Sequence, residues 1–305
     1  MKKSKLIFFN IILIFAICIL NFFNINSKSY INNDLIIHYI DVGQGDCILI
    51  QVNNKNLLID SGPSSNRDDL LNYLQKLNID KFDYIIATHP HEDHIGNMDT
   101  IIKRFNVSNF YAPKIINTSI SFENMISEFV DKSLKFNFLK SGTNTINLGL
   151  NTKVEVFSPE ENIVSDNFND YSSVIKISFL NTSFLFTGDA ENFTEDYLIS
   201  NNFNLKSDVL KVGHHGSSTS SSLKFLKAVN PSVAIISVGN NNTYGHPSLQ
   251  TLTSLKNYLP KPKLNPPPPV FLLYPLFMKN LCRKYVICWN YAITKHSLSF
   301  LIFIC

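Results

Sequence analysis

A concentration of histidines and acids follows an apolar run near residue 88. Three His and two acids lie within six positions of Thr88-His89-Pro90-His91-Glu92-Asp93-His94-Ile95-Gly96. Imidazole and carboxylate together suit Zn or Mn. In a tight turn, side chains two residues apart can converge on one ion while the next pair is offset toward a second. Because the chain holds only eight His, we predict a metal centre rather than a loop of solvated histidines.

Two later segments offer further ligands at strand ends. Asp189 follows the run Phe184-Leu185-Phe186-Thr187-Gly188, and His214 and His215 follow the run 209–212. An Asp after a strand usually caps the next helix, so the case for Asp189 depends on the His cluster. Adjacent side chains diverge. We therefore expect one of the two His to bind metal and the other to contact substrate, and periodicity does not decide which.

Three acids stand close to glycines at strand ends: Asp41, Asp46 and Asp60. One interpretation is that they orient the ligating imidazoles. The other is that they shape turns.

The elements that must position these residues follow from hydrophobic periodicity. We predict strands at 35–40, 47–52, 57–59, 84–87, 154–157, 174–180, 184–187, 209–212 and 233–238. Helices are predicted at 68–77, 122–132, 192–200, 223–229 and 249–258, with another beginning near Ile95. Hairpins and helices alternate along one chain, which indicates an α/β fold with a mixed sheet rather than a doubly wound parallel one.

The two ends of the chain differ from its middle. Residues 1–28 combine Lys2, Lys3 and Lys5 with the apolar run 6–23, which predicts an N-terminal signal anchor, a single transmembrane helix, in preference to a cleaved signal. The positive-inside rule then places residue 29 onward outside the cell membrane. A cleaved signal would give a secreted protein instead. Residues 261–305 read as a Pro-rich linker and an apolar tail without Gly or acid, typical of a shifted reading frame or a truncation.

Charge and cysteines exclude some classes of protein. Residues 29–260 carry 17 Lys and Arg against 24 Asp and Glu, a balance of −7, although the formal net charge of the whole chain is +3. An acidic middle region argues against a broad nucleic-acid-binding face. Five Cys without a Cys-x-x-Cys argue against a disulfide framework.

The motifs resemble those of a known superfamily. His89-x-His91-x-Asp93-His94 is similar to the signature of the metallo-β-lactamase superfamily. The leader Ile40-Asp41-Val42-Gly43-Gln44-Gly45-Asp46-Cys47 and the later Val212-Gly213-His214-His215-Gly216-Ser217 resemble the metallohydrolase domain of ComEC-type competence proteins. The resemblance covers roughly 35–258. It implies a hydrolase domain at 29–260 with a four-layered αββα sandwich of mixed sheets.

The resemblance also implies a ligand set for two divalent metal ions. The implied ligands are His89 and His91 for one ion, Asp93 and His94 for the other, Asp189 as the bridge, and His214 or His215. The superfamily has a further His before Asp189, but no His lies between His94 and His214. Relatives of the ComEC type share this absence, and Asp170 is the best replacement. Fewer imidazoles and more oxygens favour Mn over Zn.

Other positions are candidates for contact with the substrate. Asp93 is a candidate catalytic residue as well as a ligand. His246, in Tyr244-Gly245-His246-Pro247, would protonate a leaving alkoxide or bind a phosphate oxygen. Lys211 and Ser217 flank the His-His pair as candidate substrate-binding residues. Lys211, with Lys224 and Lys227, forms either a basic edge for DNA or a set of solvated lysines.

The function implied is hydrolysis, because two metal ions can activate water and offset charge on a phosphoryl or acyl oxygen. Fold and metals do not select the substrate. We expect a phosphodiesterase or nuclease related to DNA uptake, acting on DNA or another phosphodiester. One apolar run cannot form a pore, so a separate channel protein is an expected partner. The alternatives are a hydrolase of cell-envelope phosphoesters and a non-catalytic, metal-stabilised binding module for DNA uptake.

Overall fold

A computed structural model describes residues 34–259 and the short strands at 285–288 and 302–303. The chain separates into two units, Met1–Asp34 and Leu35–Cys305, and every element below belongs to the second. The predicted signal anchor at 1–28 and the predicted linker lie outside the described residues. Within the described part, no helix has the length and apolar character needed to cross a bilayer.

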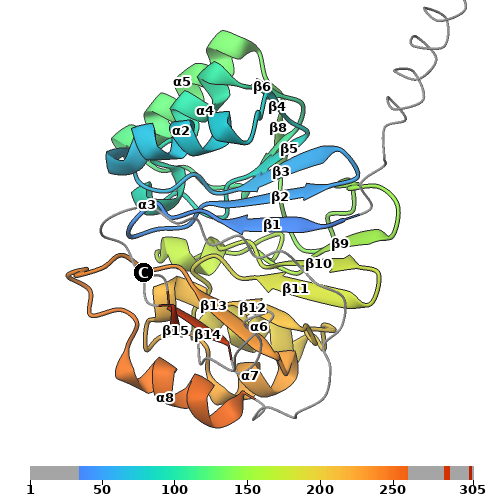
Figure 1. Cartoon of the computed structure of the whole chain (residues 1–305), viewed down its shortest axis with the longest axis vertical. Coiled ribbons are helices and arrows are strands. Elements are labelled where there is room, and N and C mark those ends of the chain that lie inside the picture. Colours follow the sequence, from blue (N-terminus) through green and yellow to red (C-terminus); the bar gives the residue numbers. More distant parts are fainter. Residues whose placement is uncertain (1–33, 260–284, 289–301, 304–305) are drawn as a thin grey trace, which may run out of the picture. The chain divides into compact units, whose positions relative to one another are not determined.

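The first sheet has six strands in the order β1-β2-β3-β5-β7-β8 (Figure 1). They are β1 (Ile36–Tyr39), β2 (Ile48–Val52), β3 (Lys55–Ile59), β5 (Tyr84–Ile86), β7 (Phe110–Ala112) and β8 (Phe136–Phe138). The first three pair antiparallel, and β3, β5, β7 and β8 pair parallel. Asn53 and Asn54 turn the β2–β3 hairpin with φ of 51° and 58°, the left-handed backbone that Asn tolerates in a two-residue hairpin turn. Beside this sheet, β4 (Lys81–Phe82) pairs with β6 (Asn106–Val107).

The second sheet runs in the order β15-β14-β13-β12-β11-β10-β9. Its strands are β9 (Thr152–Val156), β10 (Ile175–Phe179), β11 (Thr182–Phe186), β12 (Val209–Lys211), β13 (Val233–Ile236), β14 (Tyr285–Cys288) and β15 (Ile302–Phe303). Only the β11–β12 and β12–β13 ladders are parallel. Both sheets are therefore mixed, as the sequence predicted. The tail to which we assigned no structure contributes β14 and β15.

Helices cover the outer face of each sheet (Figure 1). On the first sheet lie α2 (Arg67–Lys76), α4 (Met98–Arg104) and α5 (Ile120–Lys132), which bury Leu70, Ile101 and Phe129 against it. On the second lie α6 (Asn192–Ser200), α7 (Leu223–Val229) and α8 (Leu249–Tyr258). Short helices complete the set: α3 (Glu92–Ile95), η1 (Ser64–Asn66), η2 (Phe168–Tyr171) and η3 (Gly213–Gly216).

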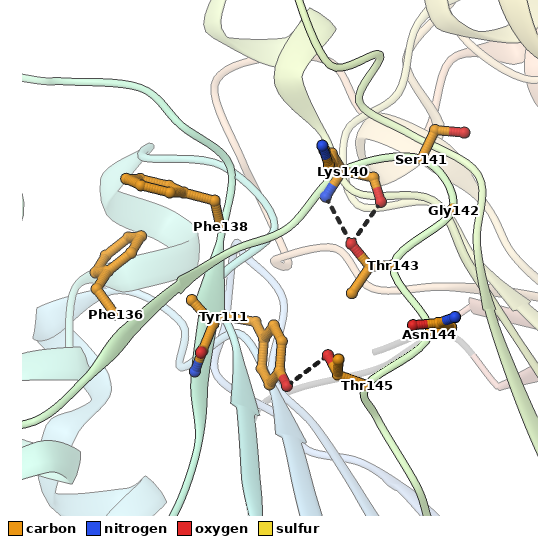
Figure 2. Close-up of a pocket in the computed structure, with 10 residues that line it drawn as sticks. Tyr111, Phe136, Phe138, Lys140, Ser141, Gly142, Thr143, Asn144 and Thr145 are labelled. Carbon is orange, nitrogen blue, oxygen red and sulfur yellow. Dashed lines mark hydrogen bonds between the residues drawn. The ribbon is translucent and has the colours of Figure 1, made fainter.

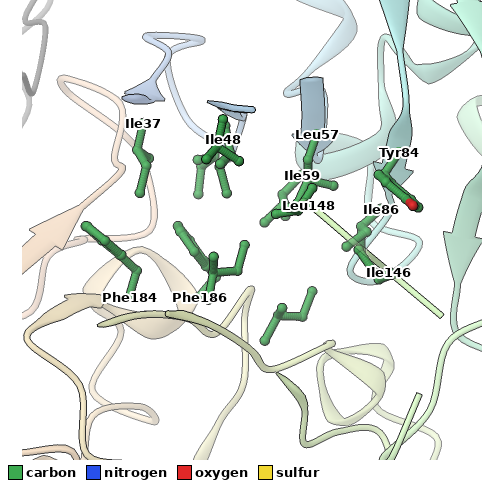
Figure 3. Close-up of a cluster of buried hydrophobic side chains, with 14 of the residues drawn as sticks. Ile37, Ile48, Leu57, Ile59, Tyr84, Ile86, Ile146, Leu148, Phe184 and Phe186 are labelled. Atoms are coloured by element: carbon green, nitrogen blue, oxygen red, sulfur yellow. The ribbon is translucent and has the colours of Figure 1, made fainter. Parts of the chain in front are cut away.

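The inner faces of the two sheets meet in a shared core (Figure 3). Ile48 and Ile59 of the first sheet pack in the same cluster as Phe184 and Phe186 of the second. Leu49, between two residues of that core, faces the helices instead, because successive side chains of a strand point to opposite faces. The layers are thus helices, sheet, sheet and helices, which confirms the four-layered αββα sandwich.

One predicted helix has a different form. Instead of one helix from Ile95, the chain forms α3 and then α4, interrupted at Gly96 and Asn97. A Cβ on Gly96 would lie 2.4 Å from the backbone nitrogen of Ser64, so two segments meet at this break. The short α3 leaves His91 at its N-terminal boundary in an extended conformation.

Candidate metal centre

The candidate site lies where strands of both sheets end. His89 comes three residues after β5 in the first sheet, while Asp189 and His215 follow β11 and β12 in the second. The carboxyl ends of strands are where open α/β sheets place their ligand sites. The site is therefore built from two sheets that share a core.

Four predicted ligands form one buried cluster, called here the metal group: Asp93, His94, Asp189 and His215. Their ligand atoms lie within 4.8 Å of one another. His94 Nε2 is 3.2 Å from Asp189 Oδ1, and His215 Nε2 is 3.2 Å from Asp93 Oδ2. His94 Nε2, His215 Nε2 and Asp189 Oδ1 are buried without a hydrogen-bond partner. A cation would satisfy such atoms, and two imidazoles with two carboxylates fit Zn or Mn.

The first two histidines of the motif stand beside the metal group. His89 Nε2 lies 3.0 Å from His91 Nδ1 and 3.9 Å from Asp189 Oδ2. The other oxygen of Asp189 faces His94. Asp189 Oδ2 also lies 3.4 Å from His215 Nε2, so Asp189 is close to ligands predicted for both ions, and its role as a bridge stays a prediction.

The side chains of the two adjacent histidines of η3 point in different directions. His215 has a side chain only 2% exposed, belongs to the metal group, and places Nδ1 2.9 Å from the Ser237 carbonyl oxygen. His214 is 23% exposed, and its Nδ1 lies 3.0 Å from Glu191 Oε1. Its Nε2 is 3.9 Å from Asp189 Oδ2. Both residues have positive φ, 45° and 50°, and this backbone sends neighbouring rings in different directions.

Asp60 orients one imidazole of the metal group. Its Oδ2 lies 2.8 Å from His94 Nδ1, and its two oxygens also accept hydrogen bonds from the Thr88 amide and hydroxyl. Because Nδ1 of His94 is engaged by a carboxylate, Nε2 faces the metal group. Asp41, by contrast, accepts from the Gly43 amide in an exposed turn.

The prediction that Lys211 binds substrate is wrong. Its side chain is fully buried, and its ammonium pairs with Asp46 Oδ2 and donates to the Val212 carbonyl. The physical reason is that β12 is a central strand, so Lys211 points into the protein and not toward solvent. Lys224 and Lys227 are exposed on α7, but the basic edge that we predicted lacks its member nearest to the His-His pair.

Asp170 lies in η2, which packs beside the strand end that carries His89. The Ser173 amide and hydroxyl both donate to the Thr88 carbonyl. Asp170 Oδ2 accepts from the Ser165 hydroxyl, while Oδ1 is buried without a hydrogen-bond partner. No described contact joins Asp170 to the metal group, so its role as a replacement ligand stays a prediction.

His246 stands near His214, and Ser217 directly follows η3, the short helix that carries His214. The rings of His246 and His214 have centroids 5.2 Å apart, and His246 Nδ1 is buried without a hydrogen-bond partner. The Asn242 side chain holds the backbone of His246 at both its amide and its carbonyl. The Ser217 hydroxyl pairs with that of Thr219, at 2.9 Å. Both assignments as substrate-contacting residues stay predictions.

The electrostatics of the site separate its histidines. Burial lowers the pKa of His94, but the carboxylates around it, led by Asp189, outweigh burial and hold the pKa well above the usual 6.5. Burial also lowers the pKa of His215, but the nearby carboxylates, led by Asp189, outweigh burial and raise this pKa to about 10. Burial and the charge of His94 hold the pKa of His89 well below 6.5. The carboxylates that favour protons on two of these rings equally favour a divalent cation in place of the protons.

The sequence analysis missed Glu191 as a site residue. Its carboxylate accepts a hydrogen bond from His214. This hydrogen bond is the largest of several causes that lower the pKa of Glu191 to about 2. The available signal was its spacing, an acid two residues after Asp189.

A separate cavity of about 460 Å³ runs along β8 and the loop after it. Figure 2 shows Phe136 and Phe138 on one side of it and Lys140 with Thr143 on the other. It is lined by none of the candidate site residues.

Several known proteins are similar in sequence to this chain. ComE operon protein 3 of Bacillus subtilis is 27% identical over 237 residues, 72% of this chain and 30% of that protein. Recombination protein 2 of Haemophilus influenzae is 32% identical over 224 residues, with 72% and 26% covered. Competence protein ComA of Neisseria gonorrhoeae is 27% identical over 218 residues, with 71% and 29% covered. The chain thus spans less than a third of the length of these relatives.

These relatives are of the ComEC type that the leader and the His-His-Gly motif resemble. Residues 40–240, most of the described part of the chain, match the Metallo-beta-lactamase superfamily. That range includes every residue of the metal group. The chain therefore belongs to the metallo-β-lactamase superfamily.

Proposed function

We propose that this protein is a metal-dependent phosphodiesterase or nuclease that acts with two divalent ions. The observation that carries the proposal is the metal group, in which buried nitrogen and oxygen atoms without hydrogen bonds converge around Asp189. His89 and His91 would hold one ion, and the residues of the metal group would hold the second. Metal ions bound there supply Lewis acidity, which activates water and offsets charge on a phosphoryl oxygen.

The chain's own residues have distinct tasks in this proposal. Asp60 fixes the His94 ring by accepting a hydrogen bond from its Nδ1, so that Nε2 faces the site. Asp93, with a 30% exposed side chain, is the acid of the metal group nearest to solvent. His246 would donate a hydrogen bond to a phosphoryl or leaving oxygen.

The relatives favour a phosphodiester, whereas the negative charge of the domain counts against a polyanion. The names of two relatives, Competence protein and Recombination protein, suit proteins that handle DNA. Residues 29–260 have a balance of −7, and two divalent ions would make this region less negative. Because Lys211 is buried in an ion pair, attraction for a polyanion would be concentrated at the metal ions themselves.

The proposal includes a place in the cell. The Lys residues and apolar run of 1–28 would anchor the protein in the cell membrane by a single span, with the hydrolase domain outside. DNA would reach it there, and a separate channel protein would provide passage across the membrane.

The test uses the full chain, purified in detergent, stripped of metal and reloaded with Mn or Zn. The substrates are single-stranded DNA and bis(p-nitrophenyl) phosphate. Metal-dependent cleavage of both is the expected result, with loss of both in Asp189→Asn and retention in Asp41→Asn. Cleavage of the small diester alone would favour an esterase of the cell envelope. Retention of DNA without any turnover would overturn the enzyme and favour a binding module.

A further inference from the structure

Glu191 occupies the N-cap position of α6 but does not cap it. Its side chain accepts no hydrogen bond from the helix. Instead Oε1 accepts from His214 Nδ1 at 3.0 Å and from the Thr219 hydroxyl, while Oε2 accepts from Asn167 Nδ2 at 2.7 Å. Both carboxylate oxygens are therefore engaged by donors, and the carboxylate has a task other than ending the helix.

His214 is held at the rim of the site in a costly conformation. Its φ of 45° and ψ of 49° are left-handed, which costs a non-Gly residue about 1–3 kcal/mol and persists where the surroundings enforce it. The His214 amide donates to the Gly188 carbonyl, and the Glu191 carboxylate holds the ring. The ring is more exposed than that of His215, and it faces His246.

The direction of the ring decides what His214 can reach. With Nδ1 turned to Glu191, Nε2 is the atom left for other contacts, and it lies 3.9 Å from Asp189 Oδ2. Like His89, His214 lies outside the metal group and 3.9 Å from Asp189 Oδ2; the hydrogen bond to the Glu191 carboxylate is what distinguishes it. A carboxylate behind an imidazole fixes which ring nitrogen faces the reaction, as in hydrolytic triads.

We propose that Glu191 is a positioning residue, which holds His214 so that its Nε2 contacts the substrate phosphoryl group without being needed to hold metal. The inference rests on the proposed hydrolase. It assigns different tasks to two adjacent histidines: His215 binds metal and His214 binds substrate.

The test compares Glu191→Gln, His214→Gln and His215→Ala in the full chain. Metal content after loading with Mn, kcat and KM for bis(p-nitrophenyl) phosphate, and Tm are measured for each variant. We expect His215→Ala to lose metal, while the other two variants keep the wild-type content. In Glu191→Gln, kcat should fall roughly 10- to 100-fold, the range for partners that orient functional histidines. The double variant Glu191→Gln/His214→Gln should be no slower than His214→Gln alone, since Glu191 acts through His214.

Glu195→Gln is the matched control. Glu195 lies one turn further along α6, and its carboxylate accepts from the amides of Ser221 and Ser222. Its loss should lower Tm and leave kcat unchanged. A merely structural role for Glu191 predicts that same pattern for Glu191→Gln and would overturn the inference. Loss of metal in His214→Gln, or additive losses in the double variant, would overturn it as well.

A second measurement separates this inference from the proposed function. The ring-nitrogen NMR signals of His214 report its tautomer in the Zn-loaded chain without substrate, since paramagnetic Mn would broaden signals this close to the site. We expect protonated Nδ1 in the wild type and loss of that preference in Glu191→Ala. Unchanged signals overturn the positioning role even if the enzyme is active. A wild-type chain without turnover overturns the hydrolase, while the signals still decide whether Glu191 orients the ring.

Discussion

Lys211 and Asp46 are buried together beside the metal group, and each is the other's ionic partner. Removing one partner leaves an uncompensated charge in the interior, which costs about 3–5 kcal/mol. We expect Lys211→Met to lower the free energy of unfolding by about that amount, measured by urea denaturation of the full chain. Lys224→Met removes an exposed partner of Asp196 and should change it by less than about 1 kcal/mol. Equal effects would contradict this account.

Asp60 offers a test of how the His94 ring is oriented. Asn can adopt the φ of 58° found at this position, so Asp60→Asn should keep the backbone. Losing the charged acceptor behind His94 should weaken metal affinity about 10- to 100-fold, measured by titrating Mn into metal-free protein. Asp41→Asn, in an exposed turn, is the control. An affinity unchanged in Asp60→Asn would show that the ring is held by other contacts.

Single residues also mark the limit of prediction from the sequence. The resemblance to the superfamily was enough to bring His94 and Asp189 together in one predicted site, whereas residue type alone left Asp189 as a possible helix cap. They did not distinguish His214 from His215, since that division depends on φ values that no pattern reveals. The prediction that Lys211 binds substrate was wrong for a related reason. A Lys at a strand end has the same pattern whether it faces solvent or a buried acid, and the acid here comes from a distant loop.

At the scale of elements, Gly45 in the loop between β1 and β2 lies against the segment that carries Asp93. A Cβ there would lie 2.2 Å from the Asp93 carbonyl oxygen, and its φ is 140°. We expect Gly45→Ala to displace Asp93 and to lower both Tm and Mn affinity. In Gly142→Ala the φ is 82° but nothing lies within 4 Å of the new Cβ, so only a backbone cost of about 1–2 kcal/mol is expected. Tm and Mn titrations measure both, and an unaffected Mn affinity in Gly45→Ala would argue against the displacement of Asp93.

The elements themselves were predicted to different degrees. Amphipathic α5 and α8 and the apolar strands β2 and β10 lie close to their predicted ends, because several residues display a period. The three-residue strands β7 and β8 were missed, although β5 and β12, of the same length, were predicted from their apolar runs. The break between α3 and α4 depends on the contact of Gly96 with a distant segment, and a local pattern does not contain it.

For the whole molecule, the metal group joins two sheets. Asp93 and His94 belong to the first half of the chain, while Asp189 and His215 follow strands of the second sheet. A ligand that binds only the folded state stabilises it by about 2.7 kcal/mol at a hundred times its Kd. We expect Mn to raise the Tm of the stripped protein and a chelator to reverse the rise. Asp189→Asn should abolish it, and an equal rise in that variant would contradict a centre shared between the sheets.

The shared core has a consequence for how the chain is made. A ribosome completes the first sheet before it has added any residue of β9, the earliest strand of the second sheet. Until then, Ile48, Ile50 and Ile59 have no partners from the second sheet. The emerging half therefore exposes apolar side chains that neighbouring nascent chains and chaperones can bind. That half also carries only part of the centre. The full set of ligands in the metal group is therefore present only once translation has passed residue 215.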